Sequence, residues 1–214
     1  MSTEISFPSV KTTMTDNPET IIDLIRHGEP VGGRKFRGNS VDDPLSEKGW
    51  AQMRDAIGEH CPWSYIVSSP MKRCIEFARE VSEQHGIPLE TETDLREVGF
   101  GSWEGRQPTE VKQTAPDEYA AFYADPVHAR PTGAEPLNDF IERTVNVYQQ
   151  IVARYHGQHI LIVSHAGVMR SIIAHTLHAA PIGLYRIKVE NAGICRIVHT
   201  SRGAMLSLHN ATLA

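Results

Sequence analysis

The chain has 214 residues, of which 40% are hydrophobic and 22% are charged, and its formal net charge is −5. This length suits one domain with room for an insertion, and the acidic balance argues against general binding to nucleic acid. The cysteines, Cys61, Cys74 and Cys195, lack CxxC spacing, which argues against a disulfide framework or a cysteine-based zinc site and favours a reducing, cytoplasmic location.

Residues 1–18 are polar and lack the apolar core of a signal peptide. We therefore expect a flexible N-terminal extension in front of a single domain, residues 19–214. No run reaches the roughly 20 apolar residues of a membrane span. The sequence thus predicts no contact with a membrane.

Strands and helices are predicted in alternation along the rest of the chain. Apolar, β-branched runs, typical of strands buried in a parallel sheet, lie at 21–25, 65–68 and 160–164. Helical patterns lie at 46–60, 70–84, 136–155 and after Gly167. Pro70 would stand in the first turn of the second helix, where proline is tolerated.

The last part of the chain predicts an antiparallel hairpin, with strands at 193–200 and 204–208 around a Ser-Arg-Gly turn. Strands that alternate with helices, followed by one hairpin, indicate a three-layer α/β/α sandwich with a mostly parallel central sheet. Residues 101–134, which hold several prolines, acidic residues and aromatic residues, fit this pattern least well. We expect them to form a lid-like insertion over the active face.

Polar residues follow each of the three parallel strands, at 26–29, 68–73 and 164–167. Ligands of open α/β sheets bind beyond the carboxyl ends of the strands, so these segments should meet at one edge. Arginine guanidinium groups suit phosphate oxygens. The main chain near Ala166 could add N–H donors at a helix N-terminus, and Gly28 would let a ligand approach closely. The pattern predicts phosphate chemistry without the Gly-rich loop of nucleoside triphosphatases.

His27 is the candidate nucleophile at this edge. One ring nitrogen must be unprotonated, and a hydrogen bond to the other nitrogen would fix the tautomer. Neighbouring guanidinium groups favour the neutral ring and balance the charge on a transferring phosphoryl group. The leaving oxygen needs a proton from a carboxylic acid that stays protonated near neutral pH. Residues 94–105 offer Glu97 as the preferred candidate and Glu104 as the second.

Four segments in this order, RHGE (26–29), SSPMKR (68–73), LREVGFGSWEG (95–105) and SHAGV (164–168), make residues 20–210 resemble the histidine phosphatase superfamily. The resemblance is to its phosphoglycerate-mutase-like branch, and HGEPVGG, DDPLSEKGWAQM and FGSWEG further resemble bacterial α-ribazole phosphatase-like proteins. Because this family needs no metal, the resemblance implies that the protein works without a metal or another cofactor.

The resemblance also implies roles for individual residues. His27 becomes phosphorylated, and Arg26 and Arg73 grip the phosphoryl group. His165 completes the phosphate pocket and steadies the transferring charge. Glu97 acts as the acid and then as the base that activates water.

The chain departs from the family pattern at Pro30 and Gly33, where the family commonly has Thr and a phosphate-contacting Asn. Arg34 or Arg37 is the candidate replacement. With Lys35, these two arginines form either a solvated loop or a clamp for a second anionic group.

Four further residues receive weaker expectations. Glu29 is expected to be structural and to hold an arginine. Glu135, in a segment like the family's Gly-x-Glu stretch, is expected behind the site or beside the substrate. Trp103 and Glu104 are candidate substrate contacts, with a core position for Trp103 left open.

The histidine pairs at 156/159 and 175/178 lack the third and fourth ligands of a zinc site. We therefore expect these four histidines at the surface. Trp50 and Trp63 are expected in the core. No metal-ligating set is predicted from the sequence.

The predicted activity is hydrolysis of a small phosphomonoester through a phosphohistidine, with α-ribazole 5′-phosphate as the best single guess. The alternatives are mutase-type transfer within phosphoglycerate, a broad-specificity sugar phosphatase, and a binding module with an inactive phosphatase fold. The compact chain and FGSWEG favour hydrolysis over mutase chemistry. The complete set of candidate catalytic residues argues against an inactive module. The expected partner is a small phosphorylated metabolite, and a homodimer is left open.

Overall fold

The computed structural model describes residues 18–214, so the expected extension over residues 1–18 lies, except for its last residue, outside the described part. The central sheet has six strands in the order β3-β2-β4-β1-β5-β6. They are β1 (Thr20–Arg26), β2 (Tyr65–Ser68), β3 (Leu89–Thr91), β4 (His159–Ser164), β5 (Ile194–Thr200) and β6 (Gly203–Ala211). Strands β3, β2, β4 and β1 pair in parallel, and β5 and β6 form the antiparallel hairpin at one edge.

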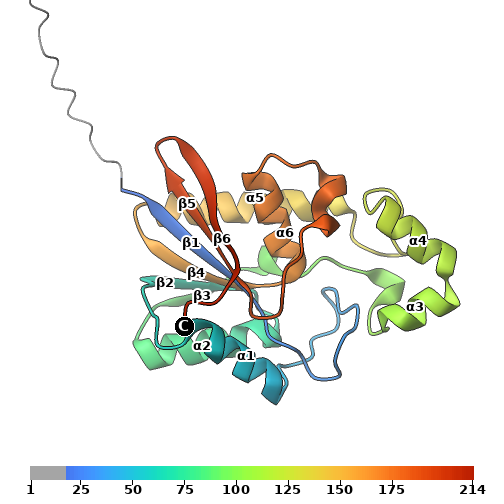
Figure 1. Ribbon diagram of the computed structural model, residues 1–214, viewed down its shortest axis with the longest axis horizontal. Coiled ribbons are helices and arrows are strands. Elements are labelled where there is room, and N and C mark those ends of the chain that lie inside the picture. Colours follow the sequence, from blue (N-terminus) through green and yellow to red (C-terminus); the bar gives the residue numbers. More distant parts are fainter. Residues whose placement is uncertain (1–17) are drawn as a thin grey trace, which may run out of the picture.

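Helices cover both faces of this sheet (Figure 1). Their bounds are α1 (Glu47–Ile57), α2 (Lys72–His85), α3 (Pro108–Thr114), α4 (Pro116–Ala124), α5 (Leu137–Arg154) and α6 (Ala166–Thr176). Side chains of α5 and α6 pack on one face with Ile22 and Leu24 of β1, while α1 and α2 pack on the other face with Ile25. Successive strand residues thus enter opposite cores. The predicted three-layer α/β sandwich is confirmed.

Local signals set the ends of the helices near their predicted positions. The Ser46 side chain accepts a hydrogen bond from the Gly49 N–H and so caps α1. Gly86 adopts a left-handed conformation that ends α2. The expectation that Pro70 occupies the first turn of α2 is wrong, because the helix begins two residues later at Lys72. The helix expected after Gly167 begins slightly earlier, at Ala166.

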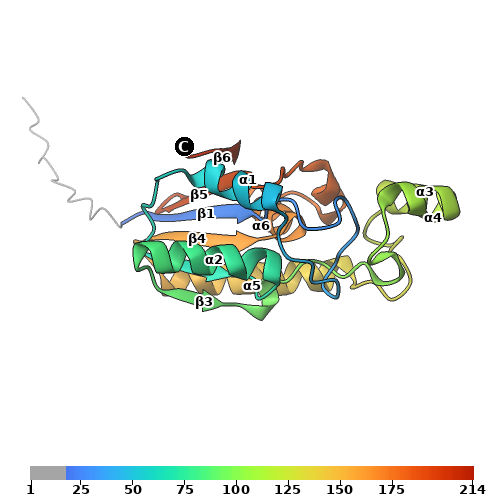
Figure 2. The same ribbon diagram turned by 90° about the horizontal axis from the view of Figure 1, so that it is seen from below.

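Residues 101–134 hold a short 3-10 helix (Gly101–Trp103) followed by α3 and α4. Figure 2 shows β1 and β4 pointing toward the end of the molecule where α3 and α4 lie. The insertion therefore stands beyond the carboxyl ends of the parallel strands. Its role as a lid stays a prediction. Among residues 18–214, no helix combines the length and apolar character needed to cross a membrane.

One polar residue interrupts the apolar strand β1. The fully buried Asp23 carboxylate accepts hydrogen bonds from Trp63 Nε1 (2.9 Å), His159 Nε2 (2.8 Å) and Arg196 Nε and Nη2 (2.7 and 2.9 Å). Burial alone would raise the pKa of Asp23, but these donors outweigh it and lower the pKa to about 2. His159 is therefore half-buried with a fixed partner, which corrects the expectation of a surface histidine.

The remaining expectations for histidine and tryptophan side chains are confirmed except for Trp50. His156, His175 and His178 are exposed, as expected. Trp63 lies in the core, whereas Trp50 is only half-buried. The Trp50 ring lies tilted against Phe77, with centroids 6.1 Å apart, and the Arg54 guanidinium lies over its face. Its position at the outer side of α1 explains the partial exposure.

Candidate active site

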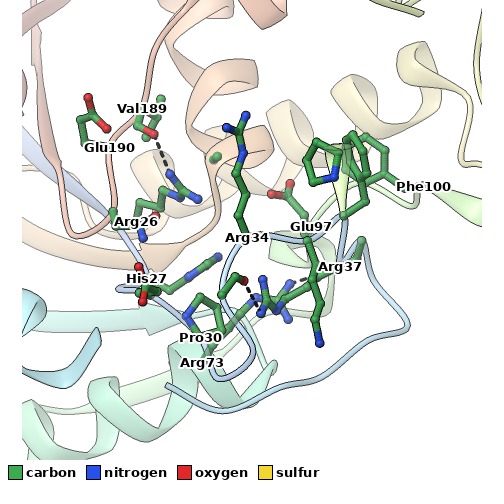
Figure 3. Close-up of a pocket in the computed structure, with 18 of the residues that line it drawn as sticks. Arg26, His27, Pro30, Arg34, Arg37, Arg73, Glu97, Phe100, Val189 and Glu190 are labelled. Carbon is green, nitrogen blue, oxygen red and sulfur yellow. Dashed lines mark hydrogen bonds between the residues drawn. The ribbon is translucent and has the colours of Figure 1, made fainter. Parts of the chain in front are cut away.

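A pocket of about 740 Å³ opens at the carboxyl ends of β1, β2 and β4 (Figure 3). Its charged and titratable lining residues are Arg26, His27, Glu29, Arg34, Lys35, Arg37, Arg73, Glu97, Arg170, Lys188 and Glu190. Three strand ends and two loops thus bring together most of the residues that the sequence selected. The seven cationic side chains outnumber the three carboxylates, so an acidic protein carries a locally positive pocket.

His27 is held in one tautomer. Its ring is 5% exposed, and Nδ1 lies 2.8 Å from the Gly28 carbonyl oxygen. Since a carbonyl only accepts, Nδ1 carries the hydrogen and Nε2 keeps its lone pair. Burial, followed by the charges of Arg26 and Arg73, holds the pKa of His27 well below its usual range. His27 is therefore a neutral imidazole with one nitrogen available as a nucleophile.

Arg73 is fully buried, and main-chain oxygens fix its guanidinium. Nη1 donates to the Val41 carbonyl and Nη2 to the Gly38 carbonyl, both at 3.0 Å. Nε donates to His165 Nδ1 at 3.3 Å. A guanidinium has five N–H groups, so two remain for a ligand in the pocket.

Arg26 is fixed in a similar way on the opposite side of His27 (Figure 3). Its Nη1 donates to the Val189 carbonyl at 2.8 Å. The buried Nε has no partner among the described residues. Burial lowers the pKa of Arg26 to about 10, so the side chain stays charged at neutral pH. A phosphoryl group beside His27 would meet permanent positive charge from both arginines.

His165 lies behind the pocket, fully buried, with its ring centroid 5.2 Å from that of His27. Nε2 is 2.8 Å from Ser69 Oγ, and Nδ1 accepts from Arg73. Burial and the Arg73 charge hold the pKa of His165 well below its usual range, so the ring is neutral. Both ring nitrogens already have partners. In this arrangement His165 accepts a hydrogen bond from Arg73 and packs edge-on against the His27 ring, and direct contact with a phosphoryl group stays a prediction.

Glu97 enters the pocket from the loop after the 3-10 turn Thr93–Leu95. Its carboxylate accepts from the Gly167 N–H, at 3.1 and 3.2 Å for the two oxygens, and from its own neighbour Val98 N at 3.0 Å. The first N–H group belongs to the N-terminal turn of α6, so one N–H of this helix end is engaged by the Glu97 carboxyl group. Ala166, the preceding residue, lines the pocket.

Glu104 and Trp103 lie outside the pocket. The Glu104 carboxylate accepts from the Ser40 hydroxyl and from the backbone N–H of Ser40 (3.1 Å) and Phe100 (2.8 Å). It therefore ties two loops together. Trp103 is 1% exposed, and its ring lies 5.0 Å from Phe36. Neither residue lines the pocket, which corrects the expectation that they contact substrate and leaves Glu97 as the candidate acid.

Gly28 serves a different purpose from the expected one. A Cβ atom there would overlap the backbone of Gly49 at the start of α1. A Cβ atom on Gly49 would in turn overlap the backbone of Glu29. The missing side chain at Gly28 lets two backbone segments cross, and it does not make room for a ligand. The Glu29 side chain pairs with Lys48 at 2.9 Å rather than with an arginine.

Arg34 and Arg37, the two candidates to replace the family's Asn, have different surroundings in the loop. Arg37 is 8% exposed and donates to Asp43 Oδ2 (3.0 Å) and to the carbonyls of Val31 and Gly33 (2.7 and 2.8 Å). It therefore shapes the loop. Arg34 is exposed and lines the pocket, and among the described residues no hydrogen bond or ion pair engages it. Of the two candidates, Arg34 is the one with a guanidinium available to a substrate.

The pocket also includes residues that sequence reasoning missed. Among its lining residues are Arg170, Lys188, Tyr123 and Tyr185. Arg170 stands four residues after Ala166 on α6, a spacing that places both on one helix face and could have revealed it. The two tyrosines come from separate segments, and no local pattern points to them. Within residues 18–214, no group of three or more His, Cys, Asp or Glu side chains could hold a metal ion.

Comparison with known proteins places this geometry in a family. The model of the histidine phosphatase superfamily (branch 1) matches residues 22–212. Adenosylcobalamin/alpha-ribazole phosphatase of Salmonella typhimurium is 32% identical over 172 residues, which cover 78% of this chain and 84% of that protein. Putative phosphoserine phosphatase 2 of Hydrogenobacter thermophilus is 30% identical over 179 residues, which cover 81% and 87%.

Solved structures agree with the sequence comparison. The crystal structure of a putative alpha-ribazole-5′-P phosphatase from Escherichia coli K-12 superposes with a TM-score of 0.79 at 26% identity, over 90% of this chain and 96% of that chain. The family model covers nearly all of the described residues. The chain belongs to the histidine phosphatase superfamily, branch 1.

Proposed function

We propose that the protein hydrolyses a small phosphomonoester through a phosphohistidine at His27. The observation that carries this proposal is the fixed tautomer of His27, whose Nδ1 is bound to the Gly28 carbonyl while Nε2 is left unprotonated between two arginines. Belonging to a superfamily of phosphatases supports the same reaction.

The reaction runs in two steps. His27 Nε2 attacks phosphorus, the P–O ester bond breaks, and the Glu97 carboxyl group donates its proton to the leaving alkoxide. Glu97, now ionised, then takes a proton from water, whose oxygen attacks phosphorus and releases inorganic phosphate and His27. Arg26 and Arg73 balance the charge on the phosphoryl oxygens in both steps.

For the substrate we propose α-ribazole 5′-phosphate. Two lines of support are the names of the Salmonella and Escherichia relatives and the size of the pocket, which falls in the usual range of small-ligand sites, roughly 300–1,000 Å³. Phe100, Tyr123 and Tyr185 line the pocket and offer aromatic surface to a ring system. The surplus of cationic side chains favours a second candidate class, a phosphate ester that carries another anionic group.

The nucleophile is tested with His27→Ala. The variant should lose hydrolysis of p-nitrophenyl phosphate and the acid-labile phosphoenzyme trapped from wild type, with an unchanged circular dichroism spectrum. Turnover by His27→Ala equal to that of wild type would refute the mechanism.

The substrate is tested by comparing kcat/KM across α-ribazole phosphate, phosphoserine, sugar phosphates and phosphoglycerates. The proposal expects the highest value for α-ribazole phosphate. A requirement for added 2,3-bisphosphoglycerate would instead favour mutase chemistry.

A further inference from the structure

We propose that Arg143 is a positioning residue that aims Glu97 through a clamp shared with Glu135. Arg143 lies on α5, and its guanidinium makes a two-pronged ion pair with the Glu135 carboxylate, Nε to Oε1 at 2.7 Å and Nη2 to Oε2 at 3.0 Å. Neither side chain lines the pocket. Any effect on the reaction must therefore pass through another group. The inference rests on the proposed acid role of Glu97.

The remaining N–H groups of Arg143 hold the segment that carries Glu97. Nη1 donates to the carbonyls of Asp94 (2.5 Å) and Arg96 (3.0 Å), and Nη2 donates to the Glu97 carbonyl (3.3 Å). One side chain thus fixes three carbonyl groups immediately before and at the candidate acid. Charge-assisted hydrogen bonds of this kind are stronger than those between neutral groups.

Glu135 holds the chain on the other side of Glu97. Its Oε2 accepts from the Gly99 N–H at 3.0 Å, and its backbone N–H donates to the Gly99 carbonyl at 3.2 Å. Arg130 closes the contact by donating from Nη2 to that same carbonyl at 2.9 Å and from Nε to the Glu135 carbonyl at 3.1 Å. The backbone is therefore fixed both before and after Glu97.

This double attachment leaves the Glu97 side chain with few ways to move. The Gly167 N–H holds the carboxyl group at the far end of this side chain. The Glu97 side chain is therefore fixed both at its backbone and at its carboxyl group. Proton transfer to a leaving oxygen requires a donor within hydrogen-bond reach, and small misplacements of a catalytic group cost large factors in rate. The expected consequence of losing the clamp is a selective loss of acid catalysis rather than a general loss of phosphate binding.

The leaving group separates these two outcomes. p-Nitrophenolate is a stable anion and leaves with little need of a proton, whereas the alkoxide of benzyl alcohol needs protonation. The value of kcat/KM for each ester reports the steps through cleavage of the P–O bond. A misplaced acid should therefore lower kcat/KM for benzyl phosphate far more than for p-nitrophenyl phosphate, and a general structural defect should lower both alike.

The experiment compares Arg143→Gln with Glu97→Gln as the positive reference. Arg154→Gln is the matched control on the same helix, because the ion pairs of Arg154 within residues 18–214 are with Glu90 of β3 and with Glu92, away from the Glu97 segment. We expect Arg143→Gln to lower the ratio of kcat/KM, benzyl to p-nitrophenyl, at least tenfold, with partial recovery in Arg143→Lys. Arg154→Gln should leave the ratio unchanged.

An unchanged ratio in Arg143→Gln beside a lowered ratio in Glu97→Gln would overturn the clamp and leave the proposed function intact. An unchanged ratio in Glu97→Gln would instead remove the proposed acid itself. If Arg143→Gln fails to fold, Glu135→Gln carries the same test, because it keeps the guanidinium on the three carbonyls and weakens its anchor. Glu135→Gln should then lower the ratio by a smaller factor, and an unchanged ratio would count against the clamp.

Discussion

Replacing Asp23 with asparagine tests the buried network that joins β1 to its two neighbours. The Asp23 carboxylate is the shared acceptor for Trp63, His159 and Arg196. Its β1 backbone pairs with β4 on one side and β5 on the other. Asparagine keeps the shape but loses the charge and one acceptor oxygen, which leaves the Arg196 guanidinium without its counter-charge.

The size of the effect follows from the pKa of Asp23. A carboxyl group whose pKa falls from 3.8 to about 2 on folding contributes about 2 kcal/mol at pH 7, since one pKa unit is about 1.4 kcal/mol. Because the folded pKa is the lower one, this contribution is complete above pH 5 or so and is lost as the pH falls toward 2, with about half remaining at pH 3. Removing one partner of a buried ion pair costs about 3–5 kcal/mol in all.

Urea unfolding of wild type and Asp23→Asn at pH 7, 5 and 3 measures both quantities. We expect a difference in the free energy of unfolding of about 3 kcal/mol or more at pH 7, shrinking by about 1 kcal/mol at pH 3. Glu80→Gln, which removes an exposed pair with Arg54, is the control and should cost under about 1 kcal/mol. A difference for Asp23→Asn that is the same at every pH would refute the assignment of the charge to this network.

Three further predictions concern the pocket. Gly167→Ala should lower kcat at least tenfold with an unchanged melting temperature, because the new Cβ would overlap Glu97 Oε1 and displace the carboxyl group from its place in the pocket; a loss of melting temperature without a loss of kcat would contradict this. The pH profile of kcat/KM, corrected for substrate ionisation, should have the midpoint of its acid limb below pH 6.5. The reason is that the pKa of His27 is lowered, so the neutral nucleophile persists at lower pH. Arg34→Gln should raise KM several-fold for esters with a second anionic group and leave KM for p-nitrophenyl phosphate unchanged; equal changes would place Arg34 at the phosphoryl group.

The parts of the site that sequence reasoning predicted are those set by local chain direction. The carboxyl ends of parallel strands meet at one edge of the sheet, so the placement of Arg26, His27 and His165 follows from their positions at or just after the ends of β1 and β4. The strand β3 was missed because its three residues, Leu-Glu-Thr, carry no apolar pattern. Helices α3 and α4 were missed because each is short and begins with a proline that also reads as a loop signal.

The errors share a different cause. Gly28 and Trp103 were interpreted from the chemistry that their residue types allow, but their neighbours decide their roles. A glycine beside a ligand and a glycine beside another backbone look alike in sequence, and only the crossing with Gly49 separates them. A tryptophan in a loop motif can stack on a ligand or fill a core, and its contacts with Phe36 and Phe122 settle the second role for Trp103.

The arginines of this protein stabilise loops and provide charge through the same side chain. Arg26, Arg37, Arg73 and Arg143 each donate at least one N–H to a main-chain carbonyl of a loop beside the pocket or behind it. A carbonyl bonded to a guanidinium fixes the loop, and the loop in turn fixes the direction of the remaining N–H groups. The positive field is therefore preorganised before any phosphate binds, which is the condition under which charge stabilises a transition state most strongly. Lysine at these positions would keep the charge but lose the planar fork that bonds carbonyl and ligand together. We expect Arg73→Lys to lose most activity while remaining folded, since the charge alone does not reproduce this arrangement.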